Sequence, residues 1–201
     1  MELPQYEAAI THALGRLQAE LSPVLLYHDY RHTAEDVMPA AERLAALSGV
    51  DGDDLQLLRV AAAYHDLGYI HAYWQHELAS LRIAALALPD FGFEPAQIDA
   101  VLGMIVSTRL PQSPRTLLEQ LLADADLDNL GRDDYFELSE GLRQELELQG
   151  QGRPLPQWRE AQITFLRQHH YFTDAARKLR GATLQRNLRD LLIGHSGDRI
   201  G

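Results

Sequence analysis

A histidine and an aspartate stand side by side at the end of an apolar run, as His65 and Asp66, and Gly68 follows them. Both side chains are common metal ligands. Inside an α-helix adjacent residues point about 100° apart, so both reach one ion only where the helix unwinds. Glycine allows such an ending because it adopts left-handed conformations at little cost. The pair alone is weak evidence for a metal site, and the segments around it add further candidate ligands.

Similar residue types recur upstream and downstream, each time at the edge of an expected helix. The pattern consists of Tyr-His-x-x-x-His-Thr at 27–33, His-Asp-Leu-Gly-Tyr at 65–69, His-Glu-x-x-Ser at 76–80 and Ala-Asp-Leu-Asp at 125–128. With these segments, and a further match over 158–172, the chain resembles the HD superfamily of metal-dependent phosphohydrolases, and specifically its bacterial branch of predicted phosphohydrolases. The resemblance covers nearly the whole chain and is specific as a set.

The resemblance implies one divalent metal ion held by four side chains: His32, His65, Asp66 and Asp126. His28 precedes the expected ligand in the first segment, and we expect it to orient a ligand rather than bind the ion. Asp124 is the alternative to Asp126. Histidine and carboxylate ligands suit Mn, Mg, Fe, Co, Ni or Zn.

Two further residues, His76 and Glu77, are candidates for a catalytic role. If this helix start faces the metal, either residue is placed to act as general acid or to orient the attacking water. The alternative is that Glu77 only stabilises the start of a helix, where the helix dipole favours a negative charge. Asp66 is expected both to bind the metal and to accept a proton from the attacking water.

Two absences narrow the resemblance. Alarmone hydrolases of this superfamily carry a Glu-Asp pair shortly after the His-Asp motif, where this chain has Tyr69 and Ile70. Dinuclear members, which include iron oxygenases, need two extra histidines before the final aspartate. This chain has Ser107 and Thr108 where the later histidine would stand. The sequence therefore favours a single metal ion and disfavours an iron oxygenase.

The expected reaction is hydrolysis of a phosphoric ester or anhydride in a small substrate, such as a phosphomonoester or a nucleotide. A divalent ion lowers the pKa of bound water and neutralises charge on phosphoryl oxygens. Arg31 and Arg109 are the candidate partners for the phosphate, because a guanidinium binds it bidentately. The alternative function is that of a non-catalytic HD-type binding or regulatory module.

Composition limits the partners. The chain has 201 residues, a net charge of -11 and no cysteine. The acidic balance argues against bulk nucleic-acid binding and against an anionic membrane surface, whereas a small phosphorylated molecule remains compatible. The N-terminus has no charged and apolar signal segment, so a cytoplasmic location is expected. A homo-oligomer is compatible with the sequence.

The hydrophobic pattern predicts an all-α chain. Together with it, the resemblance implies a single-domain helical bundle of the HD-domain type over residues 1–201. The metal-binding core is expected at about 25–131 and the C-terminal helices at about 133–195. Leu3, Ile10, Leu14 and Leu17 recur at helical spacing in the first helix. Pro39 falls inside the second expected helix and should bend it.

Three groups of side chains are left with two interpretations. Trp158, Gln162 and Phe165 recur at helical spacing, which favours core packing, with the far wall of the pocket as the alternative. The aromatic residues at 69, 73 and 74 are either core or pocket mouth. The basic stretch at 177–189 is a solvated face, or it contacts a partner or the chain's own acidic surface.

Overall fold

The computed structural model describes residues 4–197, with side chains to residue 194, and this part of the chain contains no strand. The all-α prediction is therefore confirmed for these residues. Leu3 lies outside them. The α-helices are α1 (Tyr6–Glu20), α2 (Met38–Leu47), α3 (Gly52–Tyr64), α4 (His76–Ala87), α5 (Pro95–Thr108), α6 (Leu117–Asp126), α7 (Tyr135–Leu148), α8 (Leu155–Gln168) and α9 (Asp174–Gly197).

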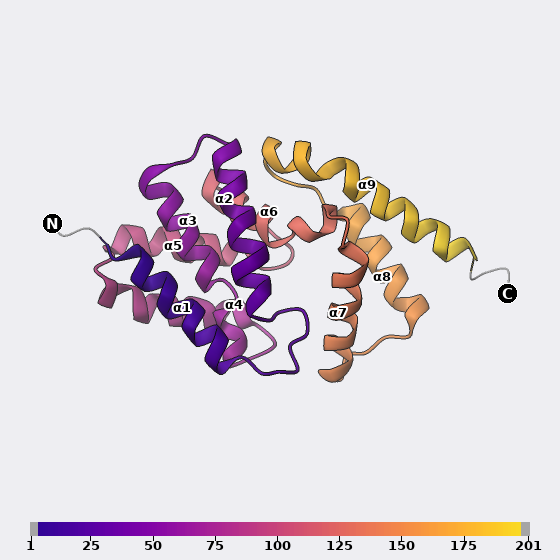
Figure 1. Ribbon diagram of the computed structural model, residues 1–201, viewed down its shortest axis with the longest axis horizontal. Coiled ribbons are helices and arrows are strands. Elements are labelled where there is room, and N and C mark those ends of the chain that lie inside the picture. Colours follow the sequence, from indigo (N-terminus) through magenta and orange to yellow (C-terminus); the bar gives the residue numbers. More distant parts are fainter. Residues whose placement is uncertain (1–3, 198–201) are drawn as a thin grey trace.

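Helix α3 is the centre of the first half of the chain. It contacts α1, α2, α5 and α6. Its last seven residues include Ala61, Ala62 and Ala63, which are fully buried, and small side chains allow neighbouring helices to approach closely. Figure 1 shows α1–α6 gathered on one side of the molecule and α7–α9 on the other. The helix that ends at His65 and Asp66 is therefore held on several sides.

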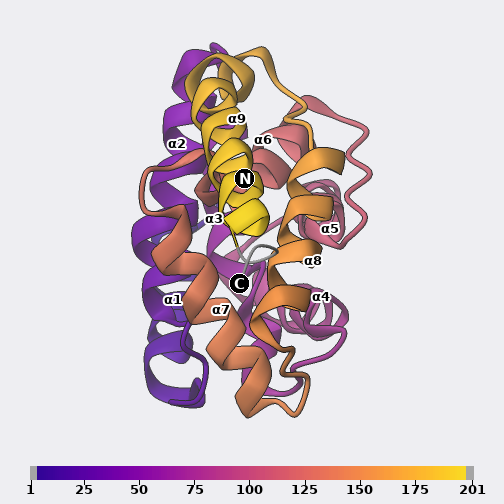
Figure 2. The same ribbon diagram turned by 90° about the vertical axis from the view of Figure 1, so that its right-hand side faces the viewer.

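The C-terminal helices form the second group. Helix α9 packs along α8 and against the short turn η4 (Asp128–Gly131), and Figure 2 shows α7, α8 and α9 from their outer side. The basic stretch contacts the chain's own acids, because both guanidinium nitrogens Nε and Nη2 of Arg180 donate to Asp128, at 2.8 and 2.7 Å. This pairing fastens α9 to the end of the α6 segment.

Helix ends follow the local sequence signals in most places. Thr116 caps α6, its hydroxyl accepting from the backbone of Glu119, and Pro95 stands in the first turn of α5 as predicted. Pro39 lies inside a continuous helical stretch, as predicted. The π-helix η1 (His32–Val37) runs without a break into α2, whose second residue is Pro39. The predicted bend stays a prediction, and the sequence did not predict the π-helical form of η1.

The prediction about Gly68 is also corrected. The four glycines with positive φ among the described residues are Gly49, Gly52, Gly92 and Gly150, so Gly68 is not left-handed. It lies in a 3₁₀ turn, η2 (Leu67–Ile70), and an added Cβ would fall 1.9 Å from the carbonyl oxygen of His76. Glycine is required there because the start of α4 packs directly on η2.

In the described part of the chain, no helix has both the length and the apolar character needed to cross a membrane.

Candidate metal centre

Four side chains from three separate segments meet at one point. His32 opens η1, His65 and Asp66 follow the last residue of α3, and Asp126 is the last residue of α6. The Nε2 atom of His32 lies 3.4 Å from Oδ2 of Asp66 and 3.5 Å from Oδ1 of Asp126. The Nε2 atom of His65 lies 3.2 Å from Oδ2 of Asp66 and 3.4 Å from Oδ1 of Asp126. The structure thus brings together all four predicted metal ligands.

The imidazole of His65 is held in the orientation that a ligand needs. Its Nδ1 atom donates a hydrogen bond of 2.7 Å to the carbonyl oxygen of Ala62. A carbonyl oxygen only accepts, so in the neutral imidazole the proton sits on Nδ1 and Nε2 presents a lone pair. That lone pair points at the two carboxylates.

The facing atoms are buried and have no hydrogen-bond partner. These atoms are Nε2 of His32, Nε2 of His65 and Oδ2 of Asp66. Leaving a buried polar atom unpaired costs about 1–3 kcal/mol. Three such atoms within 4.8 Å of one another, two of them nitrogen and one carboxylate oxygen, form a donor set that suits a divalent cation. The residues present therefore fit the metal that the sequence implies.

Electrostatics at this centre favour positive charge. Burial lowers the pKa of His32, but the carboxylates of Asp126 and Asp66 outweigh it and raise this pKa to about 9. Burial raises the pKa of Asp126, yet the neighbouring His32 and His65 lower it to about 2. The pKa of Asp66 is likewise held below its ordinary range by the histidines, against the effect of burial. The carboxylates therefore stay ionised and attract a cation.

The predicted catalytic residues lie beside the same centre. The Nε2 atom of His76 is 3.4 Å from Oδ1 of Asp66 and 3.7 Å from Oε1 of Glu77. Its Nδ1 atom donates to the carbonyl oxygen of Tyr73 at 3.2 Å, and its ring stacks on Tyr69 with centroids 3.9 Å apart. Asp66 thus turns one carboxylate oxygen to the histidine ligands and the other to His76. The catalytic roles themselves stay predictions.

Glu145 of α7 belongs to the centre, although the sequence did not point to it. Its carboxylate is fully buried and accepts from the backbone N–H groups of Tyr27 and His28, at 2.8 and 3.0 Å. It also accepts from Nδ1 of His28 at 2.6 Å and from the hydroxyl of Tyr73 at 3.0 Å. The ring of His28 in turn contacts that of His32 edge to face. Glu145 therefore fixes the segment that carries His32.

A cavity of about 520 Å³ opens from Asp66 and Asp126 toward the C-terminal helices. His28, His76 and Glu77 also line it. Trp158, Gln162 and Phe165 line the cavity, so the second interpretation of that segment, a wall of the pocket, applies. The aromatic residues at 69, 73 and 74 line the cavity too. The cavity thus joins the candidate metal centre to a wide apolar wall.

The predicted phosphate-binding arginines lie elsewhere. Arg31 is 70% exposed in its side chain and pairs with Asp29, and it lines a neighbouring surface hollow. Arg109 lines a different groove, between α4 and α5. Arg153, in the loop before α8, is the cationic side chain among the residues that line the main cavity. No motif marks Arg153 in the sequence, because it lies in a loop.

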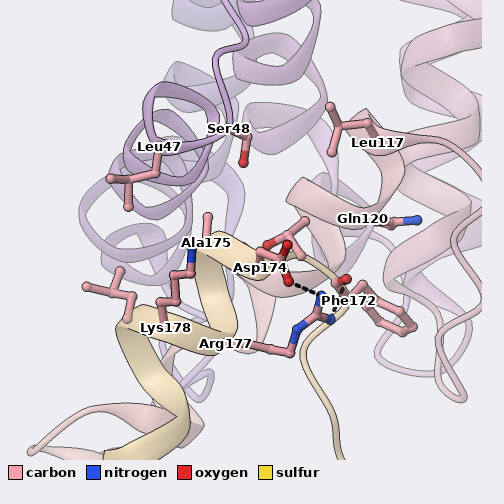
Figure 3. A pocket seen from close by; sticks show the side chains of 11 residues that line it. Leu47, Ser48, Leu117, Gln120, Phe172, Asp174, Ala175, Arg177 and Lys178 are labelled. Atoms are coloured by element: carbon pink, nitrogen blue, oxygen red, sulfur yellow. Dashed lines mark hydrogen bonds and ion pairs between the residues drawn. The ribbon is translucent and has the colours of Figure 1, made fainter.

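Asp124, the alternative ligand, has a structural role. Its buried carboxylate accepts from the backbone of Phe172 and Thr173, both at 2.8 Å, and from the hydroxyl of Thr173 at 2.7 Å. Asp124 thereby fixes the start of α9. A second hollow lies beside this helix start and is shown in Figure 3. There the guanidinium of Arg177 donates to Asp174 and to the carbonyl oxygen of Phe172. None of the predicted metal ligands lines that hollow.

No protein-family model and no curated protein matches this sequence. Among solved structures, the chain is similar to the crystal structure of a predicted HD superfamily hydrolase from an uncultured Thermotogales bacterium, with a TM-score of 0.63 and 21% sequence identity. The similarity covers 95% of this chain and 93% of that one. At this identity the likeness shows the fold. The chain therefore has the HD-domain fold, and its His32, His65 and Asp66 form a group that fits an HD-type metal site.

Proposed function

We propose that this protein is a metal-dependent phosphohydrolase that acts on a small phosphorylated substrate. The observation that carries the proposal is the convergence of three buried, unpartnered atoms of His32, His65 and Asp66, of which Asp66 also lines the main cavity. The similarity of fold to a predicted HD superfamily hydrolase supports hydrolysis as the reaction class.

His32, His65, Asp66 and Asp126 would hold one divalent ion. When bound, such an ion supplies Lewis acidity, which lowers the pKa of water and neutralises charge on a phosphoryl oxygen. Two imidazoles and two carboxylates would hold the ion and leave room on it for water and substrate. This donor set is compatible with Mn, Mg, Fe, Co, Ni or Zn.

The chain's own groups divide the remaining work. Asp66 turns Oδ2 to His32 and His65 and Oδ1 to His76. Its Oδ1 atom is therefore placed to accept a proton from the attacking water. His76 and Glu77 stand next to it on the cavity wall, where one orients that water and the other protonates the leaving oxygen. Water adds to phosphorus, the bond from phosphorus to the leaving oxygen breaks, and the freed alcohol departs with a proton.

Two neighbouring aspartates provide the test. Asp126→Ala removes a ligand from the cation centre, so we expect it to abolish both metal retention and turnover. Asp124→Asn removes hydrogen bonds at the start of α9, so we expect lower stability with metal content unchanged. Metal content is measured by elemental analysis after reconstitution with Mn²⁺, and turnover by phosphate release from a panel of phosphomonoesters and nucleotides.

The wild-type protein is expected to retain about one equivalent of metal. If Asp126→Ala retains as much metal as the wild type, the ligand assignment is wrong. If the wild type holds the metal and releases phosphate from no member of the panel, the non-catalytic binding module replaces the hydrolase.

A further inference from the structure

The main cavity is polar at one end and apolar over the rest of its wall. Its acidic and histidine side chains gather around Asp66 and Asp126. The remaining wall is made by side chains from the turn after α6 and from α7 and α8, together with the loop before α4. Its apolar members are Leu110, Leu127, Leu130, Leu142, Leu146, Trp158, Ala161 and Phe165, with the aromatic rings of Tyr69, Tyr73 and Trp74.

Several polar groups of this wall are paired within the protein, whereas the buried side-chain oxygen of Asn129, which also lines the cavity, has no partner. The hydroxyl of Tyr135 donates to the side-chain oxygen of Gln162 at 2.7 Å, and the hydroxyl of Tyr73 is bonded to Glu145. A sugar or polyol brings many hydroxyls, and each one left without a partner in a buried site costs binding energy. The wall therefore suits a ligand whose body needs few hydrogen bonds.

Two of the exposed residues that line the cavity are large and apolar. Trp74 is 60% exposed and Leu110 is 55% exposed, and Gln75 and Arg153 are exposed lining residues as well. Large apolar side chains that stay in water around one opening are characteristic of a binding site for an apolar group. Arg153 is the cationic lining residue in this otherwise acidic surrounding, which argues against substrates with several anionic groups.

We propose that the substrate is a monophosphate ester of an apolar alcohol, alkyl or aryl, with the phosphoryl group at the end of the cavity lined by Asp66 and Asp126 and the apolar body along α7 and α8. This inference rests on the proposed hydrolase function and names its substrate class. The reaction splits the bond between phosphorus and the ester oxygen, water supplies the new oxygen on phosphorus, and the apolar alcohol leaves. At about 520 Å³ the cavity is of the size that encloses a small organic molecule.

The first test is a chain-length series of n-alkyl phosphates with Mn²⁺ present throughout. Each methylene that enters an apolar wall is worth about fourfold in binding, so kcat/KM should rise by about that factor per methylene from methyl to hexyl phosphate. Glycerol phosphate is the polar control for propyl phosphate and should be the poorer substrate. A flat series, or a preference for glycerol phosphate, overturns the substrate class while leaving the hydrolase proposal in place.

Two leucines of α7 give matched variants. Leu146 lines the cavity, whereas Leu148 is 58% exposed and does not line it. Leu146→Ser should reduce the preference for hexyl over methyl phosphate by about tenfold, since it places a polar group on the apolar wall. Leu148→Ser should leave that preference unchanged. Equal preference in the wild type and in Leu146→Ser would count against the proposed orientation of the substrate.

A binding measurement separates this inference from the hydrolase proposal. The two tryptophans of the chain, Trp74 and Trp158, both line the cavity, so their fluorescence reports its occupation. The probes are hexylphosphonate and methylphosphonate, which no phosphatase cleaves. Tighter binding of hexylphosphonate supports the apolar substrate even if no ester is turned over. Equal dissociation constants for the two phosphonates overturn it.

Discussion

Glu145 shows how one residue connects the two helix groups. Its carboxylate is fully buried, and it accepts four hydrogen bonds from the segment and loop that border the metal centre. Hydrogen bonds to a charged group contribute about 1.5–3 kcal/mol each in favourable cases. Glu145 lies on α7, and its partners belong to the first half of the chain. It therefore connects α7, which forms part of the cavity wall, to the segment at 27–32 that carries His32.

We expect Glu145→Gln to lower the free energy of unfolding by about 2–3 kcal/mol, because the amide cannot pair with His28 as the carboxylate does. Glu147→Gln is the matched control on the same helix, since Glu147 is 65% exposed and pairs with Arg143. It should change stability by less than about 0.5 kcal/mol. Urea unfolding measures both variants, and equal losses in the two would contradict the role given to Glu145.

The effect of Glu145 should depend on pH in a definite direction. Burial raises the pKa of Glu145, but His28 and the two backbone donors outweigh it and hold this pKa below its ordinary value of 4.5. A carboxylate with a depressed folded-state pKa stabilises the fold above the unfolded-state pKa, and that contribution fades as pH falls through the folded-state pKa. The stability difference between the wild type and Glu145→Gln should therefore be full at pH 7 and shrink below about pH 4.5. A constant difference down to pH 3 would exclude this linkage.

Residues of the centre differ in how far the sequence could reveal them. The four predicted metal ligands lie in short segments with a recognisable pattern, so the sequence names them before any coordinates. Glu145 bonds Tyr27 across 118 positions of the chain, and no local pattern marks such a pair. Arg153 lies in a loop without a motif, and only tertiary packing brings it to the cavity.

At the scale of elements, the long helices could be predicted and their irregular ends could not. Periodic apolar residues predict α5 and α6. Pro95 marks the start of α5 and Thr116 the start of α6, within a few residues of the observed starts. The π-helix η1 and the 3₁₀ turn η2 leave no such signal, because their geometry depends on packing against other helices. These two irregular segments adjoin the ligands His32 and Asp66, so the local geometry of the centre had to come from the structure.

The contact of η2 with α4 supports a prediction at the same scale. An alanine at Gly68 would place its Cβ 1.9 Å from the carbonyl oxygen of His76 and 2.7 Å from the backbone nitrogen of Ser80. Backbone atoms cannot swing away as a side chain does, so Gly68→Ala should cost about 3 kcal/mol or more and displace His76 from Asp66. Thermal unfolding and metal content measure the two effects.

Gly15→Ala is the control for this substitution. Gly15 lies inside α1 with no atom within 4 Å of an added Cβ. Alanine restricts the unfolded chain and favours the helix, so this variant should gain about 0.5–1 kcal/mol. If Gly68→Ala behaves like Gly15→Ala, the close approach of α4 to η2 is not what the protein adopts in solution.

At the scale of the whole molecule, the candidate metal centre and the cavity lie where the two helix groups meet. Segments from the first group supply the predicted metal ligands, whereas α7 and α8 supply much of the apolar wall. The separate extents expected for the core and the C-terminal helices stay a prediction. A ligand that fills this place contacts both groups, so its binding should stabilise the molecule as a whole.

Metal addition is therefore expected to raise the melting temperature. A ligand at about one hundred times its dissociation constant stabilises the fold by about 2.7 kcal/mol. For a chain of 201 residues this corresponds to a rise of about 5–10 °C. Chelated protein is heated with and without Mn²⁺, and Asp126→Ala is heated in the same way.

The Asp126→Ala variant is also the control for unspecific binding. The net charge of -11 attracts cations to the whole surface, and Asp126→Ala preserves nearly all of that charge. A rise in the wild type that is absent from Asp126→Ala places the stabilising ion at the centre, whereas equal rises would assign the effect to the acidic surface.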